Sequence, residues 1–386
     1  MKKFCFLTVP AILVVLLAVE AWVRLTWNEK RGTPALYVSD AVLVQRFAPY
    51  YSGWFAGVPI RINNLGMRDT RDYAIEKQPG TFRILLLGDS VAFGHGSIYE
   101  HTYAYLLEHR LTSWRPDVDW QIWNAGVPGY NTSQELAYLE RVGSVYKPDL
   151  VIVGFHPNDV TSNEIIRHPS AKAVAAADAK NWIKQTFYSY EFYRRLYLNV
   201  AWRWFASEGS RVLLENLSAE DELLRNQGDV LNLPEQQFTD LLPVTHIPGP
   251  GDGCVVEGDG HAAVTSFDGE AQAARWREAV AELQALHAKG SYRLMFFVNM
   301  APDVCSDDYF YDGGSRAWND YFVEQLSKTG VPTVSTYDAF LRYRPSQMPQ
   351  AQAHALGNAN RVKADLLFEF LRDRVLPDGA SMTGVW

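Results

Sequence analysis

Three short polar motifs follow apolar runs in the first half of the chain, and each contains a residue suited to acyl chemistry. Ser90, in Gly-Asp-Ser, comes between an apolar run and a helix-like stretch, where a side chain is accessible and lies near free backbone N–H groups. Gly126 can bring its N–H close to a ligand. Asn158 can direct its amide at a developing oxyanion. Taken singly, each residue also fits an ordinary role, as a helix cap or a turn residue.

In this order, after consecutive predicted strands, the motifs resemble the conserved blocks of the SGNH (GDSL-type) hydrolase superfamily. The segments 63–69 and 124–135 are also similar to a bacterial, often membrane-anchored group of these proteins. The resemblance covers residues 63–159 and, more weakly, 267–371. It implies that Ser90 is the nucleophile. It also implies an oxyanion hole formed by the Ser90 and Gly126 N–H groups and the Asn158 side chain.

The superfamily takes its general base from a histidine before the last helix, and His354 occupies that place in this chain. An aspartate usually stands three positions earlier, but this chain has Ala351 there. Three outcomes stay open. In the first, a Ser–His dyad suffices, and a backbone carbonyl or a Gln side chain orients the ring. In the second, Asp338 or Asp303 supplies the acid. In the third, the protein has lost hydrolysis. His261, in a glycine-rich loop, is a rival base.

Two other histidines, His95 and His156, stand close to the motifs, and we expect hydrogen-bonded structural roles for them. The spacing of His, Cys and Asp residues does not match a zinc or calcium site, so the sequence predicts neither a metal nor a cofactor.

The elements that must position these residues are visible as apolar patterns. Five continuous apolar runs are typical of strands buried on both faces of a parallel sheet: 83–87, 121–123, 150–155, 293–298 and 333–337. Apolar residues at three-to-four spacing predict the helices between and after them: 103–112, 134–145, 271–289, 315–328 and 361–371. The alternation predicts a three-layer α/β/α, flavodoxin-like domain with a mostly parallel five-stranded sheet, as the resemblance also implies.

We expect this domain to comprise residues 81–160 and 263–386. A linker and N-terminal extension, 26–80, precedes it. The partly helical stretch 161–262 breaks the strand–helix rhythm, and we interpret it as an insertion that caps the active-site edge.

The first 25 residues predict an N-terminal membrane anchor. Lys2 and Lys3 precede a mostly apolar run over 4–23, which is long enough to span a bilayer as a helix. The run continues past the usual length of a signal peptide and lacks a good cleavage site, so we expect an uncleaved single-pass anchor. Basic residues on both sides leave the orientation open.

The cysteines favour an exported domain. Only Cys254 and Cys305 lie outside the apolar N-terminal run. Such sparing use predicts a disulfide between them, the alternative being two unrelated buried thiols. The expected location is the bacterial inner membrane, with the catalytic domain on the periplasmic side.

Composition limits the function further. The 386 residues are 47% hydrophobic with a net charge of −8, and the basic residues form no stripe, so a nucleic-acid partner is not expected. We predict a serine esterase for O-acyl, above all O-acetyl, esters, acting on a small molecule or on envelope or exported polysaccharide, within an envelope polysaccharide machinery. The alternatives are a polysaccharide O-acetyltransferase, a non-catalytic scaffold or glycan-binding protein, and a lipase or thioesterase.

Overall fold

The computed structural model describes residues 2–27, 32–40, 42–161, 171–204, 238–243, 270–306, 309–311, 314–351 and 354–376. Its centre is a five-stranded sheet with the order β11-β8-β7-β5-β6, in which all neighbouring strands are parallel. The strands are β5 (Thr81–Leu87), β6 (Asp119–Asn124), β7 (Leu150–Phe155), β8 (Arg293–Val298) and β11 (Thr333–Ser335). The predicted fold class is therefore confirmed.

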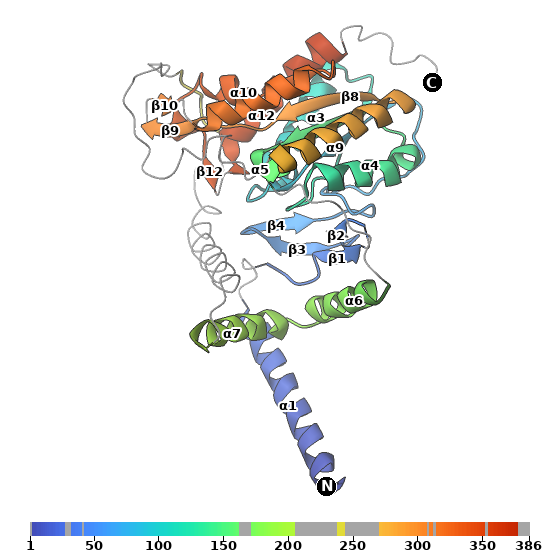
Figure 1. The fold of residues 1–386 in the computed structure, drawn as a ribbon, viewed down its shortest axis with the longest axis vertical. Helices are drawn as coiled ribbons and strands as arrows, with labels where there is room; N and C mark the ends of the chain where they lie inside the picture. Colours follow the sequence, from blue (N-terminus) through green and yellow to red (C-terminus); the bar gives the residue numbers. More distant parts are fainter. Residues whose placement is uncertain are drawn as a thin grey trace.

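Helices cover both faces of this sheet (Figure 1). One face packs against α3 (Tyr103–Trp114) and α12 (Gly357–Phe370), and the other against α4 (Thr132–Tyr146), α9 (Glu270–Lys289) and α10 (Gly314–Ser327). Successive strand residues point to opposite faces, so every strand must be apolar on both sides. This explains why the continuous apolar runs predicted the strands correctly.

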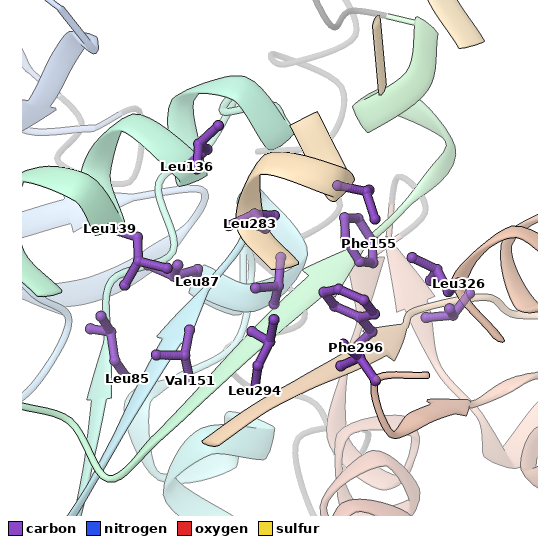
Figure 2. Packing of buried hydrophobic residues seen from close by; sticks show 14 of the residues in the cluster. Leu85, Leu87, Leu136, Leu139, Val151, Phe155, Leu283, Leu294, Phe296 and Leu326 are labelled. Carbon is purple, nitrogen blue, oxygen red and sulfur yellow. The ribbon is translucent and has the colours of Figure 1, made fainter. Parts of the chain in front are cut away.

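The core on the α4, α9 and α10 side is drawn in Figure 2. Leu85 and Leu87 of β5 contact this cluster, whereas Ile84 and Leu86 belong to the cluster on the opposite face. The helices contribute one apolar side each: Leu136, Leu139, Leu283 and Leu326 are among the buried side chains.

Helix ends differ from the predicted bounds where capping decides them. The helix predicted from 134 starts at Thr132, because the Asn131 side chain accepts from the Gln134 N–H and the Gln134 side chain accepts from the Asn131 N–H. The last helix starts at Gly357 rather than at 361. The last predicted strand stops at Ser335, since residues 337–340 form a helical turn.

Shorter elements complete the domain: α2 (Ser90–Phe93), η2 (Tyr99–His101), α5 (Pro157–Thr161), β9 (Asp303–Ser306), β10 (Tyr309–Tyr311), α11 (Tyr337–Phe340), η5 (Pro345–Gln347), β12 (Gln350–Ala351), β13 (His354–Ala355) and η6 (Leu371–Val375).

The segment predicted as a linker is a folded extension. It contains two antiparallel hairpins, β1 (Tyr37–Asp40) with β2 (Val44–Phe47), and β3 (Ser52–Phe55) with β4 (Val58–Arg61). Their apolar side chains form a buried cluster with Phe93 and Tyr130 of the main domain. The extension therefore has a core of its own that is continuous with the structure around α2.

The first helix, α1 (Lys2–Thr26), projects away from the domain (Figure 1). It is long and apolar enough to span a membrane. At its end lie α6 (Ala171–Thr186) and α7 (Ser189–Trp204), which belong to the predicted insertion. Their main contacts are with β1 and α1 rather than with the ends of the central strands. Residues 162–170, 205–237 and 244–262 of the insertion lie outside the described residues.

Candidate active site

The loop between β5 and α2 presents Ser90. The Asp89 side chain caps α2, with its Oδ1 accepting from the Val91 N–H at 2.8 Å. Ser90 is the first helical residue, so its N–H is one of the four that an α-helix leaves without an intrahelical acceptor. The sequence therefore places a hydroxyl and a backbone donor together at the C-terminal edge of the sheet, as predicted.

The structure brings His354 to this serine. The His354 Nε2 and Ser90 Oγ atoms are 2.7 Å apart, although the two residues are 264 positions apart in the chain. His354 lies on β13, which pairs with β12 so that Ala351 is the residue opposite His354. The position where the resemblance expects an acid is thus the cross-strand partner of His354, and an alanine stands there.

The predicted oxyanion donors lie next to the serine but have partners within the protein. Asn158 Nδ2 donates to Asp89 Oδ2 at 2.7 Å, and its Oδ1 lies 3.0 Å from His156 Nδ1. The Gly126 N–H donates to Asn124 Oδ1 at 3.1 Å. His156 thus has the structural role expected for it. The two amides are held in fixed orientations before any substrate binds.

Gly126 must be glycine because α2 packs directly on it. A Cβ atom there would lie 2.6 Å from the Phe93 backbone N and 2.8 Å from the Ala92 Cβ. Either contact would force α2, and with it the nucleophile, away from the end of β6. The glycine is therefore required for packing, and the backbone access predicted from the sequence stays a prediction.

Neither candidate acid is seen to contact His354. The Asp303 carboxylate accepts from the Ser315 hydroxyl at 2.9 Å, and Asp338 is an exposed partner of Arg316. Both stay predictions without geometric support. His261 and Cys254 lie outside the described residues, so the rival base and the disulfide with Cys305 also stay predictions.

The sequence reasoning missed the role that the structure gives to His95. Its ring stacks on His354, with centroids 4.4 Å apart and an interplanar angle of 27°. The His95 backbone N–H donates to the Ser90 carbonyl at 3.0 Å, which makes His95 part of the nucleophile's own turn. Burial, together with the nearby His354 and Arg68, lowers the pKa of His95 to about 3, so the ring is neutral at physiological pH. The only signal in the sequence was a histidine between two glycines.

Arg68 connects the extension to the nucleophile's turn. This buried side chain donates to the carbonyl oxygens of Phe93, Gly94 and Ser97. Its guanidinium also lies over the Phe93 ring, 4.6 Å from the centroid. The motif at 63–69 therefore holds the C-terminal end of α2 in place.

Buried ionisable groups lie behind the nucleophile. Lys363 of α12 is 4% exposed and lies 5.7 Å from the Tyr103 ring centroid. Burial lowers its pKa to about 7, opposed by the negative charge of Asp89. Burial and the nearby carboxylates raise the pKa values of Glu135 and Asp159 well above the usual range. Among the described residues, no cluster of His, Cys, Asp and Glu could hold a metal ion.

Comparison with known proteins gives distant matches. No protein-family model matches the chain. No curated protein matches it either. Among solved structures it is similar to TesA, at 12% identity over 75% of this chain and 98% of that one, with a TM-score of 0.40. It is also similar to a mutant of Axe2, an acetylxylan esterase from Geobacillus stearothermophilus, at 14% identity over 76% and 93% of the chains, with a TM-score of 0.37. A third similar structure is the acetyl xylan esterase AlAXEase, at 12% identity over 75% of this chain and 98% of that one, with a TM-score of 0.38. At these scores, the account of the site rests on its own geometry.

Proposed function

We propose that the protein is a serine esterase that cleaves O-acyl, above all O-acetyl, esters through Ser90 and His354. The 2.7 Å contact between Ser90 Oγ and His354 Nε2 carries the proposal. This distance allows the imidazole to take the hydroxyl proton as the oxygen attacks an ester carbonyl. The motif resemblance to SGNH hydrolases supports the same assignment.

The proposed reaction has two balanced stages. Ser90 Oγ forms a bond to the carbonyl carbon while its proton moves to His354 Nε2, and the tetrahedral intermediate then expels the alcohol, which takes that proton. Water next gives a proton to His354 and attacks the acyl-serine. Collapse releases the carboxylic acid and returns the proton to Ser90. A sugar hydroxyl in place of water would make the same site an O-acetyltransferase.

The oxyanion of each intermediate would be stabilised by the Ser90 N–H, the Gly126 N–H and the Asn158 amide. Asp89 fixes the Asn158 side chain, so this donor needs no reorganisation when charge develops. The Gly126 N–H would be shared between the oxyanion and Asn124 Oδ1, which makes it the weaker backbone donor.

His95 would help to orient the catalytic base in this proposal. An acid normally fixes the ring orientation of the base and stabilises the imidazolium. Stacking on His95 restricts the orientation of the His354 ring, and a neutral neighbour adds no repulsion when His354 becomes charged. The stack would then support the orientation of the base during both stages of the reaction.

The membrane anchor determines where this activity would take place. We propose that α1 holds the chain in the bacterial inner membrane and that the domain faces the periplasm, where a Cys254–Cys305 disulfide could form. The substrate would be an acylated envelope or exported polysaccharide. These assignments rest on the apolar α1 and the sparing use of cysteine.

The test uses the full chain in lipid nanodiscs and p-nitrophenyl acetate as the probe. The proposal predicts release of nitrophenol, together with an acetyl group found on Ser90 by mass spectrometry after acid quench. Ser90→Ala should abolish both signals. Adding an oligosaccharide distinguishes the two enzymes: an esterase yields acetate, and a transferase yields acetylated sugar. No acetyl-serine and no nitrophenol from folded protein would contradict the proposal.

A further inference from the structure

The end of α1 is clamped to the junction between α6 and α7. The Glu20 carboxylate, although on α1, accepts from the backbone N–H groups of Tyr188 and Ser189 at 3.2 and 2.9 Å. Arg24 donates to the Thr186 carbonyl at 2.7 Å. These bonds satisfy the exposed backbone groups at the end of α6 and the start of α7. They fix the two helices at the point where α1 leaves its apolar stretch.

Aromatic contacts strengthen this clamp. Trp22 meets Phe192 edge to face at 5.6 Å, and Trp27 meets Tyr188 in the same way at 5.7 Å. In Figure 1, α6 and α7 lie crosswise to α1 at its upper end, with the hairpins β1 to β4 between them and the central sheet. We call α6 and α7 together the platform.

The platform exposes an apolar stripe that no described residue covers. On α7, Tyr193, Leu196, Tyr197 and Val200 are 36, 50, 70 and 49% exposed. Their i, i+3, i+4, i+7 spacing places them on one side of the helix. Trp182 and Ile183 of α6 are also exposed.

The charge of the platform is opposite to that of the whole chain. Helix α6 has three lysines and one acidic residue, and α7 has three arginines and one acidic residue. The complete chain has a net charge of −8. An exposed apolar stripe with basic and aromatic neighbours is typical of helices that lie in the membrane interface and attract anionic lipids.

We infer that the platform lies in the interface of the same bilayer that α1 spans, with the α7 stripe buried among lipid headgroups and upper acyl chains. The inference rests on the proposed anchoring through α1. It adds a second attachment that fixes the orientation of the domain and the height of the active site above the membrane. A single helix followed by a linker would leave both free.

Nitroxide labels test this position in the full chain. The combined variant Cys5→Ser, Cys254→Ser, Cys305→Ser serves as the background, and labels are placed singly at Leu196→Cys and Val200→Cys. Lys328→Cys, in the exposed turn after α10, is the aqueous control, and Leu13→Cys reports on α1. The chains are reconstituted in vesicles of phosphatidylcholine and phosphatidylglycerol. Collision rates with oxygen and with a water-soluble nickel chelate are then measured.

For the labels at 196 and 200, we expect the ratio of the oxygen collision rate to the nickel collision rate to be several-fold higher than at 328. We also expect this ratio to be lower than for the label at 13. Equal ratios at 196, 200 and 328, with the label at 13 still in the bilayer, would overturn the inference and leave the anchor intact. A label at 13 that is accessible to nickel would instead overturn the anchoring itself. Dipolar broadening between labels at 196 would show a second copy on the stripe and would also overturn the inference.

Discussion

Two imidazole rings face each other at the candidate active site, and only one of them touches the serine. His354 has the geometry of a base, whereas the His95 ring stacks on that base and meets Phe55 edge to face, and its backbone N–H bonds to the turn that carries Ser90. The resemblance identified Ser90 and His354 from the sequence. It could not identify the stack, because stacking depends on where the loop before α12 folds back onto α2.

Replacing His95 tests its role as a positioning residue. We expect His95→Ala to lower kcat/KM for an acetyl ester by about 100-fold, because a misplaced base loses much of its rate advantage. His95→Phe keeps a flat ring and should stay close to the parent. Since the pKa of His95 is about 3, the acid limb of the pH–rate profile above pH 5 should be the same in His95→Phe. Equal losses in both variants would contradict the positioning role.

Lys363 gives a prediction for stability against pH. Its pKa is about 7 in the folded protein against an ordinary value of 10.5. Between these values the unfolded chain binds more protons, so the free energy of unfolding should rise with pH by up to about 1.4 kcal/mol per pH unit. Lys363→Met should be more stable at neutral pH and should lose this rise. Denaturant titrations across this pH range measure both effects, and an unchanged slope would contradict the assignment.

At the scale of elements, α2 is held from three sides: by Gly126 after β6, by Arg68 from the extension, and by β13 with its histidine. Strands of the central sheet were predictable because their apolar runs are unbroken. The hairpins β1 to β4 were not, since strands of four residues with mixed exposure resemble a linker in sequence.

The packing of α2 on Gly126 can be tested with a matched pair. Gly126→Ala should push α2 away, with a loss of about 1 to 3 kcal/mol in stability and a loss of most esterase activity. Gly129, three residues later, has φ +83° and would meet no atom within 4 Å. Gly129→Ala should therefore cost about 1 kcal/mol through backbone strain alone and leave activity near the parent. Similar activity in both variants would show that the close contact with α2 is unimportant.

The pairing of β12 with β13 allows the effect of an acid at position 351 to be tested. Ala351 is the residue opposite His354. We expect Ala351→Asp to place a carboxylate beside the imidazole, which stabilises the imidazolium and moves the acid limb of the kcat/KM profile to higher pH. The esterase rate at its optimum should increase. Ala351→Asn, without the charge, is the control, and the same profile in both variants would contradict this geometry.

At the scale of the whole molecule, an α/β domain, a hairpin extension and a helical platform follow one another from top to bottom, and α1 projects below the platform (Figure 1). The sequence predicted the apolar helix and the domain but not the platform's place. An amphipathic pattern shows that a helix has two different faces, and it does not show what covers them. The insertion was expected at the active-site edge. Its described helices contact β1 and α1, whereas its described residues 238–243 pack beside Ala355 and Asn358, next to His354.

The central claim is that Ser90 is an activated nucleophile with His354 as its base. The most direct measurement is labelling of the full chain in nanodiscs with a fluorophosphonate, in which Ser90 Oγ displaces fluoride from phosphorus. The account predicts a label on Ser90 that is absent in Ser90→Ala and steeply reduced in His354→Ala. An unlabelled parent with intact circular dichroism, or a Ser90→Ala variant labelled as strongly as the parent, would contradict it.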